Sequence, residues 1–406
     1  MQSVAVVRRP FAQTNSRRRS RELGRRQAPR ARTQPVTTVA IVGGGVVGTM
    51  HAWMARRRGL DVVQLDRDAE PRRASVRNFG LVWVSGRARG AELALALRSR
   101  ELWEAIGAEV PGVGFRPNGS LTVALHRAEL AVMEEMVAQP DAAARGMKLL
   151  APVEVGALNP GVRGEIEGAL FCERDAVVEP RLALPAVRAH LHSRGGYRFL
   201  PNRNVVGIDR GEVVDHTGER HRADHVVLAT GDAYHGVAAD HLAGAPLRRC
   251  RLQMCQTAPF EPALTTSIAD GDSLRYYPAF QLPSLAGLDP PAAIVARHHM
   301  QLLLVQRANG ELTIGDTHAY DEPFDFAVEE EAYAYLLARA ERILGTTLPP
   351  VRRRWAGVYS QSTDDRVVHR TGVLGGDGAV VVTGLGGRGM TLAPAVAEET
   401  FAELGA

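Results

Sequence analysis

The pattern of apolar and polar positions predicts a chain that contains both strands and helices. Thr38–Val42 is a short apolar run that suits a strand buried in a parallel sheet, and Asp61–Leu65 predicts a second strand. Between them, apolar residues recur at helical spacing from Met50, and this pattern ends near Gly59. Further helices are predicted at about 91–107, 127–138 and 328–343, and further strands with tight turns at 120–125, 302–306 and 311–314.

The first predicted strand leads directly into a glycine-rich turn, GGGVVG, that fits the pattern G-x-G-x-x-G. In such a turn Gly43 permits the sharp bend, Gly45 lets the backbone approach a pyrophosphate, and Gly48 lets the helix pack closely on the strand. The helix that follows directs its free N–H groups at the phosphates. Asp66, at the end of the second strand, is placed to accept hydrogen bonds from a ribose and disfavours NADP. A dinucleotide site is predicted, with FAD and NAD both open at this point.

The composition is that of an ordinary soluble globular protein, with 45% hydrophobic and 23% charged residues. A chain of 406 residues is long for a single core, so two domains are expected. No apolar run reaches the roughly 18 residues of a membrane-spanning helix. The three cysteines form no metal-ligand pattern, which indicates a reduced, cytoplasmic protein.

The basic net charge belongs to the first 36 residues. They carry ten arginines and one glutamate, so without them the formal charge of +4 becomes about −5. This segment has few apolar residues and no periodicity, and we expect it to be a disordered basic tail. Binding of nucleic acid by the rest of the chain is therefore not expected.

The residues that follow Asp66 favour FAD. A nicotinamide enzyme normally continues into another strand–helix unit, whereas this chain continues with the polar loop RRASVRNFGL. This arrangement resembles the D-amino-acid oxidase superfamily of FAD enzymes, which includes glycine oxidase and sarcosine oxidase. The resemblance implies that Ser75, Arg77, Asn78 and Gly80 lie along the isoalloxazine ring of a non-covalently bound FAD.

Three later segments extend the resemblance to the C-terminal region: Gly168–Leu182, Ala223–Gly231 and Val380–Glu398. In the superfamily, the last of these places a glycine-rich turn and a helix N-terminus against the flavin edge that becomes anionic on reduction. The cofactor-binding residues implied are Gly43, Gly45, Val47, Gly48, Asp66, Arg67, Ser75, Arg77, Asn78, Gly80, Val205, Val206, Thr230, Gly231, Gly387, Arg388, Gly389, Met390 and Thr391.

The expected fold is of the α/β class, with a Rossmann-like FAD-binding domain interleaved with a substrate domain built on an antiparallel sheet. The FAD-binding domain is predicted at 37–85, 150–235 and 365–406. The substrate domain is predicted at 86–149 and 236–364.

The substrate prediction depends on a departure from the superfamily. Many amino-acid oxidases of this group read W-x-G-L-R-P, and that arginine binds the substrate carboxylate; here the sequence is WAGVYSQ, with Tyr359 at the arginine position. A hydroxyl cannot form the bidentate charged pair of a guanidinium, so ordinary α-amino acids are doubtful substrates. Together with CRLQM and SLRYY, the segment is similar to a clade associated with phosphonate breakdown, which implies a substrate like 2-aminoethylphosphonate. The catalytic candidates are Arg275, Tyr359 and Asn78, and further candidates for anion binding are Arg77, Tyr276, Tyr277 and Arg388.

The expected chemistry is transfer of a hydride from the amine carbon to the flavin, followed by hydrolysis of the imine to an aldehyde and ammonia. Dioxygen or another acceptor reoxidises the flavin, and Lys148, the only lysine, is not placed to assist oxygen. The pair His298-His299 has no third ligand at metal spacing, so no metal is predicted. Two alternatives stay open: an oxidase or dehydrogenase of amino acids or N-methyl amino acids, and the flavin subunit of a dehydrogenase complex.

Overall fold

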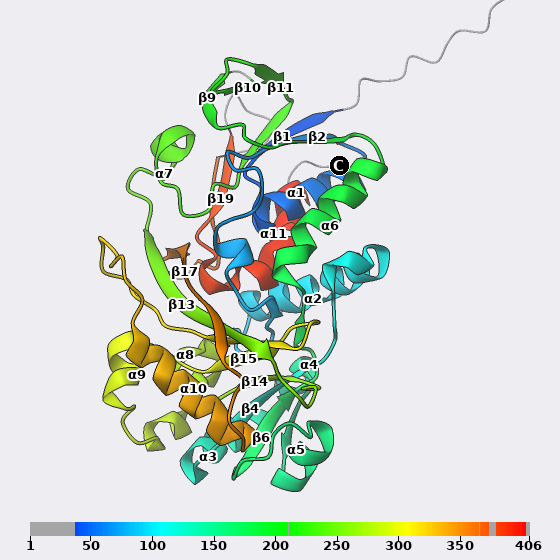
Figure 1. The fold of residues 1–406 in the computed structure, drawn as a ribbon. Helices are drawn as coiled ribbons and strands as arrows, with labels where there is room; N and C mark the ends of the chain where they lie inside the picture. Colours follow the sequence, from blue (N-terminus) through cyan, green and yellow to red (C-terminus); the bar gives the residue numbers. More distant parts are fainter. Residues whose placement is uncertain (1–36, 210, 365, 373–378, 403–406) are drawn as a thin grey trace, which may run out of the picture. The chain divides into compact units, whose positions relative to one another are not determined.

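The computed structural model describes residues 37–209, 211–364, 366–372 and 379–402. The predicted disordered tail at 1–36 lies outside these ranges. Within them, the chain forms two large sheets and crosses between the sheets several times (Figure 1). None of the helices in these ranges is both long and apolar enough to cross a lipid bilayer.

The first large sheet has the strand order β18-β19-β12-β1-β2-β8. Its strands pair in parallel except at one edge, where β18 is antiparallel to β19. The two strands predicted at the glycine motif lie in the middle of this sheet with the predicted bounds. The six strands are β1 (Thr38–Val42), β2 (Asp61–Leu65), β8 (Tyr197–Leu200), β12 (His225–Leu228), β18 (His369–Thr371) and β19 (Val380–Thr383).

Strand β1 is apolar throughout because both of its faces are buried. Val39 and Ile41 belong to a core shared with four helices, whereas Ala40 and Val42 belong to a smaller core on the opposite face. The four helices are α1 (Val46–Arg57), α2 (Ala91–Glu109), α6 (Pro180–Ser193) and α11 (Gly389–Ala402). The smaller core includes residues of a three-stranded sheet, β9 (Val205–Asp209), β10 (Glu212–Asp215) and β11 (Arg220–Arg222).

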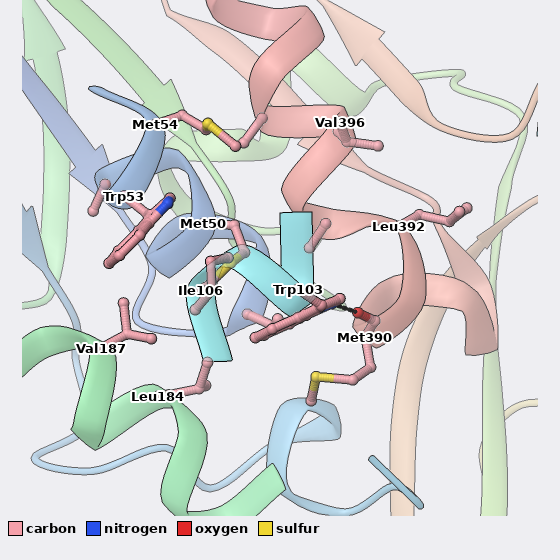
Figure 2. Packing of buried hydrophobic residues seen from close by; sticks show 14 of the residues in the cluster. Met50, Trp53, Met54, Trp103, Ile106, Leu184, Val187, Met390, Leu392 and Val396 are labelled. Carbon is pink, nitrogen blue, oxygen red and sulfur yellow. Dashed lines mark hydrogen bonds between the residues drawn. The ribbon is translucent and has the colours of Figure 1, made fainter. Parts of the chain in front are cut away.

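Figure 2 shows the four-helix core around the indole of Trp103. Trp103 and Ile106 of α2 are buried with Met50 of α1, Leu184 of α6 and Met390 of α11. Helix α2 was predicted to begin the substrate domain at 86–149, yet it packs against α1 and α11 beside the first sheet. That prediction is corrected because the apolar face of α2 has its partners in the first core.

The second large sheet has the strand order β17-β13-β16-β15-β14-β4-β6-β5. Neighbouring strands are antiparallel except β4 and β14, which pair in parallel. The strands predicted at 120–125, 302–306 and 311–314 correspond to β4, β15 and β16. The bounds are β4 (Ser120–Ala124), β5 (Met147–Leu150), β6 (Gly168–Cys172), β13 (Leu247–Pro259), β14 (Ser267–Ala269), β15 (Leu303–Gln306), β16 (Glu311–Gly315) and β17 (Val351–Ser362).

A second predicted domain boundary differs from the structure at strand β6. It lies within 150–235, predicted as part of the FAD-binding domain, but it pairs with β4 and β5 in the second sheet. The chain returns to the first sheet after β6, through β7 (Ala176–Val177), which pairs with β3 (Leu81–Val82). The α/β fold with an interleaved, largely antiparallel second sheet is confirmed.

Helix α10 covers one face of the second sheet. Its apolar residues recur every three or four positions, from Ala332 through Leu336 to Ile343, and they pack on Leu304 and Ile314 of the sheet. Other helices border this sheet and the loops around it, whereas α7 (Ala239–Leu242) contributes Leu242 to the smaller core of the first sheet. The bounds of the helices near the second sheet are α3 (Arg127–Val137), α4 (Ala142–Arg145), α5 (Pro152–Leu158), α8 (Ser273–Tyr276), α9 (Ala293–His298) and α10 (Glu330–Leu344).

Candidate active site

A cavity of about 770 Å³ lies where the carboxyl ends of the parallel strands meet the second sheet. Val42 and Leu65, the last residues of β1 and β2, line it from one side, and Met254 and Leu303 line it from the second sheet. Ligands of open α/β sheets bind at these strand ends, and sites for small molecules typically measure about 300–1,000 Å³. The position and the size of the cavity both fit a bound organic cofactor.

The glycine turn forms part of the cavity wall, and at two of its positions any side chain larger than glycine would clash with the neighbouring backbone. Gly43 has a φ of +121°, and a Cβ there would lie 2.2 Å from the carbonyl oxygen of Ala229. A Cβ on Gly48 would lie 2.1 Å from the carbonyl oxygen of Gly43. Gly45 caps helix α1 and lines the cavity, so the first turn of α1 begins at the cavity wall. This geometry fits the diphosphate of a dinucleotide, which needs exposed backbone N–H groups at a helix N-terminus.

Asp66 is held at the cavity wall by two backbone groups. Its carboxylate accepts hydrogen bonds from the N–H of Gly44 and, at 2.7 Å, from the N–H of Asp68. Behind the turn, the buried guanidinium of Arg188 donates to the carbonyl oxygen of Gly44. The acid is therefore fixed beside the glycine turn, where the other lone pairs of its oxygens can accept ribose hydroxyl groups.

The loop that follows Asp66 is tied to helices α1 and α11. The hydroxyl of Ser75 accepts a hydrogen bond from the N–H of Val46 at 2.9 Å. Further along, the N–H of Trp83 donates to the hydroxyl of Thr391 at 2.9 Å, and this hydroxyl lies 3.2 Å from the carbonyl oxygen of Leu81. The predicted flavin loop and the start of α11 thus form adjoining parts of the same cavity wall.

Asp175 fixes the continuation of this loop to the second sheet. Its fully buried carboxylate accepts hydrogen bonds from the backbone N–H groups of Val84 and Ser85 and from the hydroxyls of Ser85 and Ser120. Burial raises the pKa of this carboxyl group, while the four donors act in the opposite direction. Asp175 therefore joins the cavity loop to β4 without touching the cavity.

Most of the residues predicted to bind the cofactor line this cavity. They are Gly43, Gly45, Val47, Asp66, Arg67, Ser75, Arg77, Asn78, Val205, Val206, Thr230, Gly231, Gly387, Arg388, Gly389, Met390 and Thr391. Gly48 and Gly80 lie behind the wall. Gly80 has a φ of +69°, and a Cβ there would lie 2.1 Å from the carbonyl oxygen of Val178, so it serves close backbone packing.

The three catalytic candidates differ in where they lie, and Asn78 lines the cavity. Both ends of the Asn78 amide hold its own loop: Nδ2 donates to the carbonyl of Ala74, and Oδ1 accepts from the N–H of Gly80. Arg275 does not line the cavity, and its guanidinium donates to the carbonyl of Asp289. We therefore withdraw Arg275 as a substrate-binding residue. Tyr359 does line the cavity, where it is 7% exposed.

A cluster of two arginines and one glutamate forms one part of the cavity wall. Glu92 Oε1 lies 3.4 Å from Nη1 of Arg87 and 3.4 Å from Nη1 of Arg388. Arg87 is 5% exposed, and its Nε donates to the carbonyl of Trp83 at 2.8 Å. Because two guanidinium groups share one carboxylate, this arginine cluster carries a net positive charge and favours an anion.

A second polar group, the Asp316 cluster, consists of Asp316, His318 and Gln301. All three side chains are buried and line the cavity. Oδ1 of Asp316 accepts a hydrogen bond from Nε2 of Gln301 at 3.2 Å, and Oδ2 lies 3.6 Å from Nε2 of His318. Burial raises the pKa of Asp316 to about 8 and lowers the pKa of His318 to about 4.

Tyr276 and Tyr277 connect the two clusters. The guanidinium of Arg87 lies 5.6 Å from the ring centroid of Tyr277, which meets the ring of Tyr276 edge-on at 5.0 Å. Tyr276 in turn stacks on His318 with centroids 4.5 Å apart. The cavity therefore has a cationic end and an acidic end with aromatic side chains between them.

The sequence predicted only some of the charged and aromatic residues in these two clusters. Arg87 follows the RNFGLVWVSG run directly, and Asp316 and His318 follow β16 in the run GDTH. A carboxylate and a histidine two residues apart at a strand end are a usable signal, but nothing local shows that they face Tyr276. His299, noted as one of a histidine pair, contributes its carbonyl oxygen, which lies 2.7 Å from Nδ1 of His318.

Potential metal ligands gather elsewhere. Among the described residues, Asp215, Glu219 and His221 form the one group within mutual reach. Arg203 already pairs with both carboxylates, at 2.9 and 3.2 Å, so their charge is partly balanced. His298 instead lies 3.1 Å from Oε1 of Glu331.

Comparisons with known proteins agree with this geometry. The family model DAO, described as FAD dependent oxidoreductase, matches residues 38–403. Among solved structures, glycine oxidase from Bacillus cereus ATCC 14579 superposes with a TM-score of 0.73 at 19% identity, covering 91% of this chain and 97% of that one. L-proline dehydrogenase from P. horikoshii gives a TM-score of 0.72 at 20% identity, covering 91% and 94%. These two likenesses concern the fold.

Two curated relatives are more similar in sequence. An opine oxidase subunit of Rhizobium meliloti is 28% identical over 240 residues, which are 56% of this chain and 64% of that protein. The tRNA 5-methylaminomethyl-2-thiouridine biosynthesis bifunctional protein MnmC of Caulobacter vibrioides is 29% identical over 405 residues, covering 96% of this chain and 58% of that protein. The chain spans less than two thirds of the length of these relatives.

Proposed function

The chain belongs to the DAO family of FAD dependent oxidoreductases, and we propose that it oxidatively deaminates a small primary amine with an anionic head group, such as an aminophosphonate. The observation that carries the proposal is the pair of arginines, Arg87 and Arg388, that share Glu92 in the wall of a cavity fitted to FAD. Relatives named for glycine, L-proline and opines support a substrate with an amino group.

The arginine cluster supports an anionic head. The Nη2 group of Arg87 has no acceptor among the described residues, so it is available to a ligand. Guanidinium groups bind phosphonate and carboxylate oxygens through charge-assisted hydrogen bonds. Tyr277, whose ring lies beside Arg87, places a phenolic side chain in the same region.

Tyr359 does not supply the positive charge that an α-carboxylate would need at this place in the cavity. A Cβ on Gly387 would lie 3.6 Å from the hydroxyl of Tyr359, so this phenol lies against the glycine turn at the start of α11. A phenol there offers one hydrogen bond and no positive charge. The charged partners are instead Arg87 and Arg388, which suits a substrate with its anionic head on the arginine cluster.

The residues of this chain would bind and orient the cofactor and the substrate. FAD, when bound, acts as the two-electron acceptor. The glycine turn, Asp66 and the start of α11 would hold that cofactor, with no covalent attachment expected. Trp83, Tyr276 and Tyr277 would surround the amine with aromatic side chains and limit its contact with water. Water then hydrolyses the imine product to an aldehyde and ammonia.

The proposal is tested by mixing the FAD-loaded protein with amines in the absence of oxygen and following the absorbance of oxidised flavin. We expect bleaching and ammonia release with 2-aminoethylphosphonate or its hydroxylated form, and none with D-alanine. Ethylphosphonate and propylamine are matched controls, because each lacks one of the two charged groups. Strong bleaching by D-alanine or sarcosine, with none by aminophosphonates, would overturn the substrate assignment.

A second candidate is a flavin subunit that passes electrons to a partner protein. It is favoured by the Rhizobium meliloti relative, which is named as one subunit of an opine oxidase. Hydrogen peroxide formation by the isolated chain in air would support an oxidase. Flavin that an amine reduces and that stays reduced in air would instead support the flavin-subunit role.

A further inference from the structure

At the acidic end of the cavity, the buried amide oxygen of Gln301 has no hydrogen-bond donor among the described residues, and the one side-chain donor to the Asp316 carboxylate binds Oδ1. Asp316 is 7% exposed, and its Oδ2 faces Nε2 of His318 at 3.6 Å, beyond hydrogen-bond distance. Oε1 of Gln301, whose amide nitrogen holds the other carboxylate oxygen, is buried and has no partner in the part of the chain that the structure describes. Buried acceptors of this kind require a donor, which a ligand can bring.

The tautomer of His318 makes the shortage of donors more severe. Its Nδ1 lies 2.7 Å from the carbonyl oxygen of His299, and because a carbonyl only accepts, Nδ1 carries the hydrogen. The ring is neutral, since burial lowers its pKa to about 4. Nε2 therefore presents a lone pair to Asp316, and the two acceptors are compatible when a proton or a cationic donor lies beside both.

The surrounding side chains suit a cation. The ring of Tyr276 stacks on His318 at 4.5 Å and meets Tyr277 edge-on at 5.0 Å. Aromatic faces attract ammonium groups through their quadrupole. The aromatic faces and the carboxylate lie in the wall of the same cavity, and Arg87 lies beside the ring of Tyr277.

We propose that the Asp316 carboxylate binds the ammonium group of the substrate and accepts its proton, with His318 as a positioning residue. The inference rests on the proposed amine substrate and assigns its nitrogen to one end of the cavity. An ammonium group has three N–H donors, enough to satisfy Asp316 and His318 together. Its anionic head then points into the cavity on the side of Arg87.

The proton transfer is balanced within the substrate and Asp316. The N–H bond of the ammonium breaks and its electron pair stays on nitrogen, which leaves a neutral amine. An O–H bond forms on the carboxylate, which becomes a neutral acid, and no electron is transferred. The lone pair on nitrogen is what the later oxidation of the amine requires.

The electrostatics of the site support this role. With the pKa of Asp316 near 8, a proton moves to it from an alkylammonium of pKa about 10.4 at a cost of about two pKa units, against about six for an ordinary carboxyl. Other ionisable groups also face Asp316 from the neighbouring elements. Burial raises the pKa values of Tyr276, Tyr277, Tyr320, Tyr359 and Cys250, so these groups stay neutral near pH 8. The nearby cations are Arg248, stacked on Tyr320, and Arg87.

The test is a binding measurement on FAD-loaded protein that has been chemically reduced, so that the amine is not consumed. Calorimetry gives the dissociation constants of 2-aminoethylphosphonate and of ethylphosphonate, which lacks the amine. At pH 8 we expect the wild type to bind the amine-bearing ligand about tenfold to a hundredfold more tightly. In Asp316→Asn this ratio should fall to about one. A ratio near one in the wild type, or an unchanged ratio in the variant, would overturn the proposal.

Two variants separate the role of Asp316 from general effects. Asp316→Glu keeps the carboxylate and should recover part of the preference for the amine. Asp321→Asn removes an exposed acid a few residues along the chain and should leave the ratio unchanged. A loss in Asp321→Asn equal to that in Asp316→Asn would point to long-range electrostatics and contradict a direct contact.

A measurement on the wild type alone covers the case in which Asp316→Asn does not fold. Sulfonate ligands suit this measurement, because a sulfonate keeps a single charge over this pH range whereas a phosphonate itself titrates within it. The affinity for 2-aminoethylsulfonate should rise with pH up to about 8 as Asp316 ionises, while that for ethylsulfonate should show no such rise. A flat profile for both ligands would overturn the inference. Failure of the proposed function looks different, because no amine would then bleach the oxidised flavin even if the binding preference and its dependence on Asp316 hold.

Discussion

The indole N–H of Trp103 donates a hydrogen bond to the carbonyl oxygen of Met390 at 2.8 Å, and this contact joins α2 to the start of α11 (Figure 2). In a regular helix the carbonyl of Met390 would accept the N–H of residue 394. That residue is Pro394, which has no N–H. Trp103 therefore supplies the donor that the proline removes, next to the turn that lines the cavity.

Replacing Trp103 with phenylalanine should destabilise the protein by about 1–3 kcal/mol. Phenylalanine leaves part of the indole volume empty, and in addition the buried carbonyl of Met390 loses its donor. Urea unfolding of the FAD-loaded protein measures the loss. In a Pro394→Ala background the backbone N–H returns, so the same substitution should cost less. An equal cost in both backgrounds would show that packing alone explains the effect.

Gly45→Val should abolish FAD retention without unfolding the protein. A Cβ there would lie 3.0 Å from Oγ of Ser75, which accepts the N–H of Val46, and the branched side chain would extend into the cavity. The ratio of flavin to protein after gel filtration reports the result. Gly287→Val, at an exposed glycine with open space around it, is the control. A fully yellow Gly45→Val protein would place the diphosphate elsewhere.

Arg87→Gln should weaken the binding of ethylphosphonate by about tenfold to a hundredfold, because a charged partner of the head group is lost. Arg275→Gln is a matched control, since Arg275 lies outside the cavity and donates to the carbonyl of Asp289. Calorimetry on both variants decides between the two arginines. A loss confined to Arg275→Gln would restore the sequence-based assignment and contradict the arginine cluster.

Stability should fall as the pH is lowered, in part because of His51. This side chain is fully buried between α1 and α11, where burial lowers its pKa to about 4. The unfolded chain takes up the proton near pH 6.5 and the folded one does not. The unfolding free energy should therefore drop by about 2 kcal/mol between pH 7 and pH 5 from this residue. His51→Gln should flatten that part of the profile, and an identical slope in the variant would show that His51 does not contribute.

The sequence could predict those elements whose pattern lies in one continuous segment of the chain. Strands β1 and β2 were predicted with their observed bounds because their patterns and the intervening glycine turn are continuous in the chain. The partner of Trp103 could not be predicted, since Met390 lies 287 residues away and only tertiary packing brings α2 to α11. The apolar run of β6 suited either sheet, and its pairing with β4 decided the outcome.

The residues of the candidate site were likewise predictable only where they belong to one contiguous motif. The FAD cradle was predictable because G-x-G-x-x-G, Asp66 and the GLGGRGMT turn are contiguous motifs. The residues proposed to contact the substrate were mostly missed. Arg87 and Asp316 come from distant segments, and each is an ordinary charged residue until the fold places both beside Tyr277.

The most direct test of the account is a crystal structure of the reduced, FAD-loaded protein with 2-aminoethylphosphonate. We predict the diphosphate of FAD along the glycine turn, the phosphonate within hydrogen-bond distance of Arg87, and the amine nitrogen at Asp316. A ligand bound in the opposite orientation, or outside this cavity, would contradict the central claim that its two charged ends select the substrate.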